Sequence, residues 1–416
     1  MSVRIPTSAS SLRQNAHLTF KHNLHQGRHG WLRLTPAYSV RLVTDILAGR
    51  ESGTEVLDPF SGTGTTALCA SYLGLCGSGL EINPFLVWFS GVKSRQFAAK
   101  TIGHTRKLAA EIAAIIASPS ASMVEPPPIH NISRWWKSAE LEFLCKLKAG
   151  IQDCAAPASD ERDLLLVAFC RTLIKISNAA FNHQSMSFKE ADTSPDLFGF
   201  SYNYCEDFIE NLSFVLEGAA DNPATTPCFL EGDARAPSHF LRGKYDVLIT
   251  SPPYPNRISY IRELRPYMYW LEFLKNGREA GEYDWQAIGG TWGIATSRLA
   301  DWSASADTYF PHSLRRIVAE IDSPKNMNGR VLSNYIVKYF GDIWRHIEDV
   351  RRVLNGHAEI HYIVGNSSFY ETHLPVEAIY KDMLEKAGFR HVQIAKLRKR
   401  NSKAELFEFD VSGKMG

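Results

Sequence analysis

The chain has 416 residues, enough for one domain with a second lobe. Its 46 Lys and Arg nearly balance 44 Asp and Glu, so the net charge of +2 does not indicate a polyanionic partner. Seven scattered cysteines without a Cys-x-x-Cys pair give no basis for a zinc knuckle or a disulfide framework. The N-terminus is polar and no stretch approaches a membrane span, so we expect a reduced, cytoplasmic setting and no metal.

The first predicted elements are a strand, a glycine-rich turn and a helix. Residues 54–57 have the short apolar pattern of a strand, and residues 67–74 predict a helix that ends at Gly74. Such a turn brings a cofactor close to the backbone. A second predicted strand, 76–80, is followed by Glu81, where an acidic side chain is well placed to bind both hydroxyls of a ribose.

The turn between these elements indicates which cofactor is bound. Gly62 and Gly64 would also suit a nicotinamide dinucleotide, but Asp58-Pro59-Phe60 precedes them. A carboxylate repels a pyrophosphate, which needs uncharged N–H groups. A carboxylate and an aromatic ring suit a cofactor with an ammonium group, an adenine and no phosphate, such as S-adenosylmethionine. We expect Asp58 to hold the methionine end and Phe60 to border the adenosine.

A mainly helical segment is predicted from about residue 100 to 222. Apolar residues recur at near-helical spacing in 140–154, 160–178 and 204–217. Trp135 and Trp136 precede these helices, and we favour a packing role for them over base stacking. A linker-like break with three prolines, 126–128, comes before this tryptophan pair.

The run Ser251-Pro252-Pro253-Tyr254 follows an apolar predicted strand, 245–250. The prolines offer no backbone N–H and cannot continue a sheet, so they form a rigid corner. A hydroxyl precedes this corner and an aromatic ring follows it. The arrangement suits a flat group that bears an amine: Tyr254 would stack on it, while Ser251 Oγ and backbone carbonyls would accept the amine hydrogens.

The remaining C-terminal half offers weaker patterns. Arg257, Arg262 and Arg265 stand beside the aromatic run 267–270; we expect phosphate contacts from the arginines and core packing from residues 268–271. Residues 279–327 look irregular, and 279–330 is a possible target-recognition segment. Residues 388–395 and 405–411 predict a closing hairpin, and the basic run between them is either a phosphate-binding patch or a solvated face.

In this order, the motifs resemble those of amino-group DNA methyltransferases, and Ser251 points to the site-specific cytosine-N4 type. Four further segments carry the resemblance: 21–47, 79–85 and 231–235 as cofactor motifs, and 339–367 as the helix and strand that follow the catalytic loop. The resemblance implies an α/β, Rossmann-like S-adenosylmethionine-dependent methyltransferase fold. The sheet would be mostly parallel with a C-terminal antiparallel hairpin, and a mainly helical insertion would be added.

The resemblance also implies roles for individual residues. The implied cofactor contacts are Thr35, Asp58, Pro59, Phe60, Gly62, Gly64, Thr65, Glu81, Ile82, Asp233 and Ala234. The implied catalytic residues are Ser251, Pro252, Pro253 and Tyr254, and the implied DNA contacts are Arg257, Arg262, Arg265, Arg398 and Arg400. We expect three parts: 1–97 and 223–416 as the two halves of a catalytic domain, and 98–222 as an insertion and possible DNA-recognition lobe.

The implied reaction is methylation of the N4 amine of a flipped cytosine in a specific sequence of double-stranded DNA. It would serve restriction–modification or DNA protection in a prokaryotic cytoplasm or nucleoid, with any cognate endonuclease acting separately. Two departures from the family pattern are the glycine-rich motif lying before the catalytic loop and the long segment 98–222.

Three alternatives stay open: an adenine-N6 DNA methyltransferase, an RNA guanine-N2 methyltransferase and an inactive DNA-binding relative. Cytosine-C5 methylation needs a Pro-Cys pair in the catalytic loop. The pair Pro227-Cys228 instead opens a predicted strand, in which we expect Cys228 to be buried.

Overall fold

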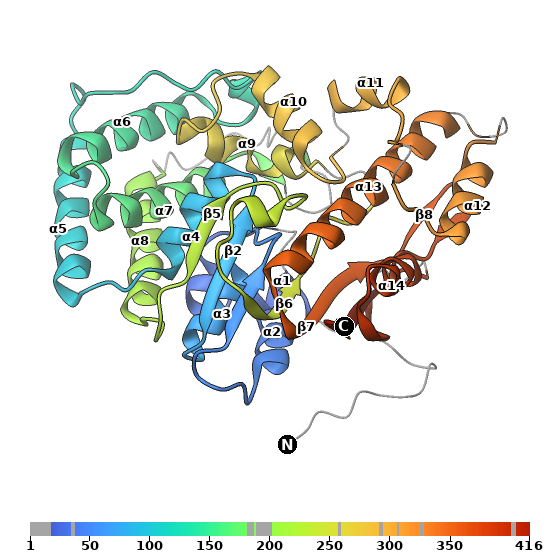
Figure 1. The fold of residues 1–416 in the computed structure, drawn as a ribbon. Helices are drawn as coiled ribbons and strands as arrows, with labels where there is room; N and C mark the ends of the chain where they lie inside the picture. Colours follow the sequence, from blue (N-terminus) through green and yellow to red (C-terminus); the bar gives the residue numbers. More distant parts are fainter. Residues whose placement is uncertain are drawn as a thin grey trace.

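The computed structural model describes residues 18–34, 38–180, 187–188, 202–256, 259–290, 294–305, 308–323, 326, 328–400 and 405–416. Within these residues a seven-stranded sheet forms the centre of the molecule (Figure 1). Its strands, in spatial order, are β10 (Arg390–Lys399), β11 (Phe407–Lys414), β7 (Leu354–Gly365), β6 (Tyr245–Thr250), β1 (Glu55–Asp58), β2 (Cys76–Glu81) and β5 (Cys228–Glu231). Two small ribbons, β3 (Ala179–Ala180) with β4 (Ser187–Phe188) and β8 (Ser367–Phe369) with β9 (Thr372–Leu374), lie outside it.

The strand directions confirm the expected Rossmann-like fold. Strands β5, β2, β1, β6 and β7 are parallel neighbours, whereas β11 pairs antiparallel with both β7 and β10. The predicted C-terminal hairpin is therefore present. Because parallel strands end at the same edge, the loops that follow β1, β2, β5 and β6 meet there.

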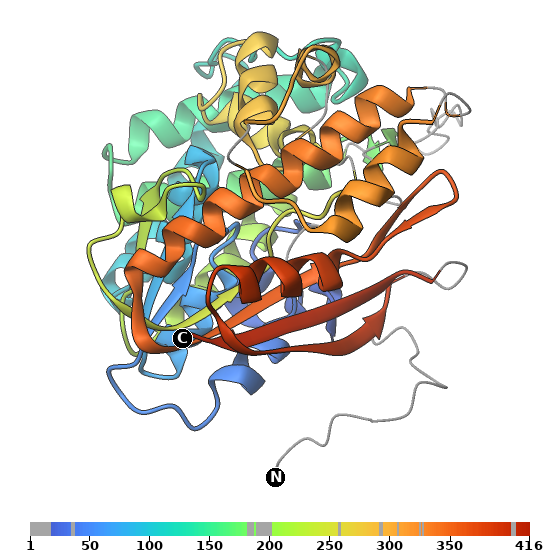
Figure 2. The same ribbon diagram turned by 45° about the vertical axis from the view of Figure 1, so that its right-hand side comes forward.

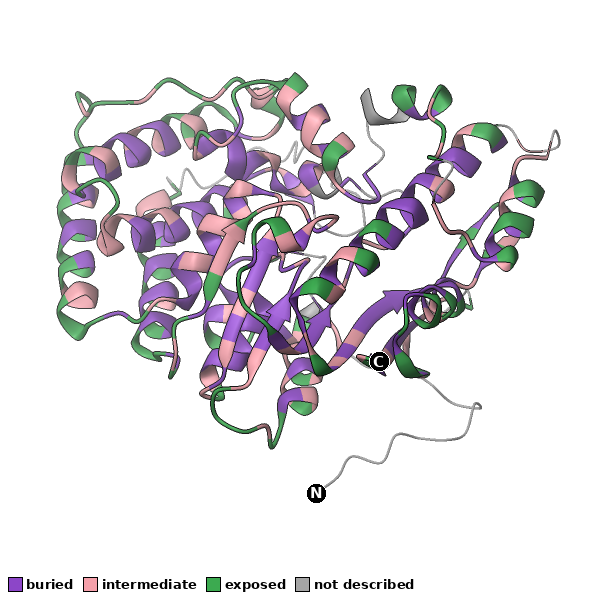
Figure 3. Cartoon of the chain, in the orientation of Figure 1, coloured by how far each residue is buried: buried purple, intermediate pink, exposed green. Residues whose placement is uncertain are grey.

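Helices cover both faces of the sheet. Successive strand residues point to opposite faces, so Val56 packs toward α2 (Val40–Leu47) and α3 (Thr65–Tyr72), while Leu57 packs toward the other face. That second face is covered by α13 (Gly329–Val350) and α14 (Val376–Lys386). Figure 2 shows α13 crossing in front of the sheet, and Figure 3 shows that buried residues gather on the strands and on the helix faces turned toward them.

The predicted helical insertion is confirmed. Its helices, grouped on the left of Figure 1, are α5 (Ala99–Ile116), α6 (Ser138–Cys154), α7 (Asp160–Lys175) and α8 (Tyr204–Ala220). They share one hydrophobic core with α4 (Pro84–Ser94) and α9 (Tyr260–Trp270). Trp136 is buried in this core and donates its indole N–H to the Leu173 carbonyl at 2.9 Å, which favours the packing role. The three-part division of the chain stays a prediction.

A buried arginine ties the insertion to the start of the chain. Arg28 lies in the 3₁₀ turn η2 (Gly27–Gly30), which follows α1 (Phe20–Asn23). Its guanidinium donates to the carbonyls of Gly218 and Ala219 at the end of α8, each at 2.8 Å. It also donates to the Lys93 carbonyl in α4 at 3.2 Å. One satisfied cation thus joins three segments that are far apart in the sequence.

The segment predicted to be irregular, 279–327, is largely helical, so that prediction was wrong. It contains most of α10 (Gly277–Gln286), then α11 (Ile294–Ala300) and α12 (His312–Ile321). Helix α12 buries Leu314, Ile317 and Ile321, which recur at helical spacing. The period is obscured in α10, because the side that it buries consists of Ala280, Gly281 and Asp284.

The prediction of a buried Cys228 was also wrong. Cys228 does lie in a strand, but β5 is the edge of the sheet and its thiol is exposed. Three further 3₁₀ turns complete the described elements: η3 (Ile132–Arg134), η4 (Pro237–His239) and η5 (Arg351–Val353). None of the described helices has the length and apolar character that crossing a membrane requires.

Candidate active site

A cavity of about 570 Å³ opens where the loops after β1, β2, β5 and β6 meet. It gathers most of the residues predicted for the cofactor and for catalysis. The predicted residues that line it are Pro59, Phe60, Gly62, Thr65, Glu81, Ile82, Asp233, Ala234, Ser251, Pro252, Pro253, Tyr254, Arg398 and Arg400. Four other predicted residues are described but do not line it: Asp58, Gly64, Arg262 and Arg265. Thr35 and Arg257 lie outside the described residues.

Asp58 is fully buried and does not line the cavity, although we expected it to hold the methionine end of the cofactor. Its Oδ1 accepts hydrogen bonds from Thr250 Oγ1 at 2.6 Å and from the Phe60 N–H at 3.1 Å. Its Oδ2 accepts from Thr66 Oγ1 at 2.8 Å and from the Tyr38 hydroxyl at 3.0 Å. Burial raises the pKa of this carboxyl group, and the hydrogen bonds oppose the rise. In the structure Asp58 is a junction between loops.

The glycine-rich turn needs its glycines for backbone shape and close packing. Gly62 and Gly64 have φ angles of +50° and +71°, a region that favours glycine. A Cβ atom at Gly64 would also lie 2.8 Å from the ring of Phe229. Gly64 therefore sets the turn that leads into α3, although it does not line the cavity.

Glu81 lies at the cavity wall with both carboxylate oxygens oriented by the backbone. Oε2 accepts from the N–H of Gly62 and Oε1 from the N–H of Asn83, each at 2.9 Å. Each oxygen retains lone-pair capacity for a further donor. Burial raises the pKa of Glu81 to about 7, against the opposing effect of these two bonds. Glu81 therefore fits an acceptor for paired hydroxyl groups.

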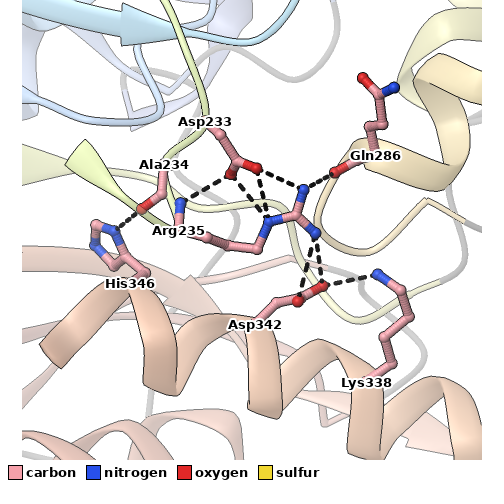
Figure 4. A network of polar contacts seen from close by, with 7 residues as sticks. All are labelled: Asp233, Ala234, Arg235, Gln286, Lys338, Asp342 and His346. Atoms are coloured by element: carbon pink, nitrogen blue, oxygen red, sulfur yellow. Dashed lines mark hydrogen bonds and ion pairs between the residues drawn. The ribbon is translucent and has the colours of Figure 1, made fainter. Parts of the chain in front are cut away.

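Asp233 lies at another part of the wall, in the network shown in Figure 4. Arg235 donates to it from Nε at 3.0 Å to Oδ1 and from Nη2 at 2.7 Å to Oδ2. Arg235 also donates to the Gln286 carbonyl in α10 at 2.8 Å and contacts Asp342 in α13 at 3.5 Å. Burial acts to raise the pKa of Asp233, but the bonds from Arg235 hold it below its usual range. Asp233 is thus kept ionised as an acceptor.

His346 supports the backbone next to Asp233 (Figure 4). Its Nδ1 lies 2.6 Å from the Ala234 carbonyl and its Nε2 lies 2.9 Å from the Tyr362 hydroxyl. Burial lowers the pKa of His346 to about 4, so the ring is neutral at pH 7. Since a carbonyl only accepts, Nδ1 carries the proton and Nε2 accepts from Tyr362. The ring also packs edge-on against Phe60, with centroids 4.8 Å apart.

The proline corner is held by hydrogen bonds to groups from three other elements. Ser251 Oγ donates to the Ile363 carbonyl in β7 at 3.1 Å. This bond uses the hydroxyl proton and leaves Oγ with lone-pair capacity to accept, as the predicted role requires. The Tyr254 hydroxyl donates to Glu408 Oε1 in β11 at 2.8 Å, and the Tyr339 hydroxyl donates to the Pro253 carbonyl at 2.8 Å.

The C-terminal hairpin forms part of the cavity wall. Arg398 makes a bidentate ion pair with Glu408, with distances of 2.8 and 3.0 Å. The guanidinium carbon of Arg400 lies 4.7 Å from the centroid of the Tyr254 ring. Both arginines therefore point toward the site and do not form an outward-facing phosphate-binding patch on the strand. Arg262 and Arg265 lie on α9 and do not themselves line the cavity. The neighbouring Met268, Tyr269 and Trp270 are buried in the core as predicted, and Leu271 packs against it partly buried.

Several residues that shape the site were missed by sequence reasoning. They are Tyr38, Arg235, Tyr339, His346, Tyr362 and Glu408. All of these except Glu408 occur in segments that carry the family resemblance, but nothing in their spacing gave them a role. In the part of the chain that the structure describes, no group of three or more His, Cys, Asp or Glu side chains is arranged to hold a metal ion.

Replacing Asp58 with Ala should destabilise the protein. Four donors, three of them buried, would lose this acceptor, so we expect the free energy of unfolding to fall by about 2 kcal/mol or more. Urea denaturation measures this. Asp45→Ala is the matched control: Asp45 is half exposed on α2, and its loss should change the free energy by about 0.5 kcal/mol or less. Equal, small effects of both substitutions would contradict the junction role.

Comparisons with known proteins give similarity over most of the chain at low identity. The chain is 20% identical over 358 residues to the Type II methyltransferase M.MvaI of Kocuria varians, covering 81% of this chain and 76% of that protein. It is 22% identical over 422 residues to the Type II methyltransferase M.AvaI of Nostoc sp., covering 89% and 81%. A shorter match to M.BsoBI of Geobacillus stearothermophilus is 36% identical over 69 residues, 16% of this chain and 14% of that protein. No family model matches the chain.

Two solved structures resemble the chain loosely. One is TrmN from Thermus thermophilus, with 9% identity and a TM-score of 0.30; the match covers 96% of this chain but about half, 53%, of that chain. The other is the rRNA methyltransferase aviRa from Streptomyces viridochromogenes, with 10% identity, a TM-score of 0.27 and coverage of 91% and 86%. At these TM-scores the likeness carries no information about substrates.

Proposed function

We propose that this protein is a DNA methyltransferase that methylates the N4 amine of a cytosine flipped out of a specific double-stranded sequence. The observation that carries the proposal is the shared cavity, in which the glycine-rich turn, Glu81 and Asp233 face the same space as Ser251–Tyr254. The similarity to two Type II methyltransferases over most of the chain supports a DNA methyltransferase. The choice of cytosine rests on Ser251 and on the family resemblance.

The residues around the cavity fit S-adenosylmethionine. Glu81 would accept hydrogen bonds from the two ribose hydroxyls, and ionised Asp233 would accept from the adenine amine. Phe60 would border the adenosine, with its ring held from behind by His346. Asp58 would shape this site without touching the ligand, because its carboxyl group is fully buried, does not line the cavity and already accepts two hydrogen bonds at each oxygen.

The chemistry required of the protein is mainly positioning. S-adenosylmethionine, when bound, supplies a methyl group on a positively charged sulfur. The target amine is a poor nucleophile because its lone pair is delocalised into the ring. A new N–C bond would replace the S–C bond, whose electron pair would stay on sulfur, and the amine would then lose one proton to solvent. Holding the amine in line with the methyl group supplies most of the acceleration.

Ser251 and Tyr254 would hold the base. A base inside a duplex cannot reach the cavity, so it must first flip out of the helix. Tyr254 would offer a stacking face, and Ser251 Oγ together with the carbonyl of Ser251 or Pro252 would accept the amine hydrogens. Arg400, which covers the Tyr254 ring in the structure, would have to move aside to admit the base.

In keeping with the family resemblance, the protein would protect DNA in a restriction–modification system, with a separate endonuclease as its counterpart.

Identification of the methylated nucleoside tests the proposal directly. The purified protein is incubated with labelled S-adenosylmethionine and either DNA or RNA, and the digested product is identified by mass. We expect N4-methylcytosine in DNA. N6-methyladenine would move the assignment to the adenine enzymes, label found only in RNA would refute the DNA substrate, and no label in either would favour an inactive DNA-binding relative.

Tyr254→Ala should nearly abolish methyl transfer while sparing cofactor binding. Loss of the stacking face should lower kcat/KM for DNA by about 100-fold, since base stacking on an aromatic ring contributes about 1–3 kcal/mol. The affinity for S-adenosylhomocysteine, measured by calorimetry, should stay within about twofold. Tyr254→Phe is the control: it keeps the ring, loses the hydroxyl that donates to Glu408 and should retain most of the stacking. Full activity of Tyr254→Ala would show that the active site lies elsewhere.

Cofactor affinity should rise with pH through the titration of Glu81. Its raised pKa of about 7 means that the carboxyl group is largely protonated at pH 6 and ionised at pH 8. Ribose hydroxyls donate better to the ionised form, so affinity for S-adenosylhomocysteine should increase several-fold, up to about tenfold, from pH 6 to 8 and then level off. Calorimetry across this range measures it. Glu81→Gln should bind more weakly and lose this dependence; an unchanged profile would refute the role of Glu81.

A further inference from the structure

One face of helix α13 carries three polar side chains that contact the loops around the cavity. Tyr339, Asp342 and His346 stand at positions i, i+3 and i+7, so they follow one another along the same side of the helix. Figure 4 shows His346 and Asp342 on this helix, both directed at the segment that carries Asp233. The helix therefore contacts both the predicted cofactor wall and, through Tyr339, the catalytic corner.

The contact of Tyr339 is one step in a chain of hydroxyl groups. Its oxygen lies 2.8 Å from the Pro253 carbonyl and 3.0 Å from the hydroxyl of Tyr380 in α14. A carbonyl can only accept, and a hydroxyl has a single proton, so Tyr339 donates to Pro253. Tyr339 then accepts from Tyr380. Both tyrosines are almost completely buried, which shields the chain from competing water.

His346 makes a second, parallel chain two turns further along α13. Tyr362 donates to His346, and His346 donates to the Ala234 carbonyl. Both chains start at a buried tyrosine hydroxyl and end on a backbone carbonyl of the cavity lining. The two carbonyls belong to different walls, since Pro253 lies in the catalytic corner and Ala234 lies beside Asp233.

Pro253 has particular need of such support. Pro252 and Pro253 have no N–H groups, so the backbone of these two residues can be anchored only through their carbonyls and by packing. Methyl transfer depends on alignment, and a displacement of 1 Å in a positioning element can cost about 100-fold in rate. A hydrogen bond that fixes the Pro253 carbonyl therefore acts on the orientation of Ser251 and Tyr254 toward the methyl donor.

We propose that Tyr339 is a positioning residue for methyl transfer: its hydroxyl, oriented by Tyr380, fixes the Pro253 carbonyl and with it the angle of the catalytic corner. The inference rests on the proposed function. It assigns a role to α13, a helix from which no residue takes part in the methyl transfer itself. His346 serves the cofactor wall in the same way. One helix thus aligns the two halves of the site, and each half depends on a different side chain.

The test compares Tyr339→Phe with Tyr362→Phe. Each variant removes one hydroxyl from an almost fully buried ring: Tyr339 is the middle link of its chain, and Tyr362 starts the other. The loss in thermal stability should therefore be similar. Tyr339→Phe should lower kcat about tenfold or more and leave the Kd for S-adenosylhomocysteine within about twofold. Tyr362→Phe should instead weaken cofactor binding, by about three- to tenfold, and change kcat less.

A third variant tests the direction of the chain. Tyr380→Phe should lower kcat less than Tyr339→Phe, because the Tyr339 donor remains, and it should add little in the Tyr339→Phe background. If the wild-type protein methylates DNA and Tyr339→Phe keeps a normal kcat, the positioning role alone is overturned. The positioning role is also overturned if Tyr339→Phe and Tyr362→Phe change kcat and Kd alike, since that pattern indicates only loss of packing. Absence of methylation by the wild-type protein would refute the proposed function itself.

Discussion

The buried carboxylate of Asp58 is the constraint on which the site depends. It accepts hydrogen bonds from Thr250, the last residue of β6, and from the N–H of Phe60 at the start of the glycine-rich turn. Ser251 follows Thr250 directly, so one side chain links the predicted cofactor turn to the catalytic corner across two adjacent strands. A buried carboxylate is tolerated only when it is fully hydrogen-bonded, and its four donors satisfy that requirement.

Further support for the site comes from α13, which covers one face of the sheet, and from the C-terminal hairpin. Helix α13 reaches the catalytic corner through Tyr339, the cofactor wall through His346 and the Asp233–Arg235 pair through Asp342. The hairpin of β10 and β11 adds Glu408, which holds both Tyr254 and Arg398. These hydrogen bonds hold Pro253, Ala234 and Tyr254 in place in the structure, as a reaction governed by alignment requires.

The sequence was sufficient to predict the sheet and the meeting of its loops, because short apolar strands with motif residues at their ends imply one common edge. It also pointed to Ser251–Tyr254, Glu81 and Asp233. It could not show that the Asp58 side chain points into the core and not into the cavity, because the sequence of a motif does not reveal the direction of each side chain. Contacts such as Tyr339 with Pro253, 86 positions apart, leave no trace in local periodicity. The exposed position of Cys228 depends on strand order, and α10 was missed because it buries small and polar residues.

A crystal structure with S-adenosylhomocysteine tests the central claim most directly, namely that one cavity serves both substrates. We expect the ribose hydroxyls at Glu81, the adenine amine at Asp233 and the sulfur directed toward Ser251–Tyr254, with Asp58 still bonded to Thr250 and untouched by the ligand. A ligand bound outside this cavity, or one whose sulfur points away from Tyr254, would contradict the proposed reaction.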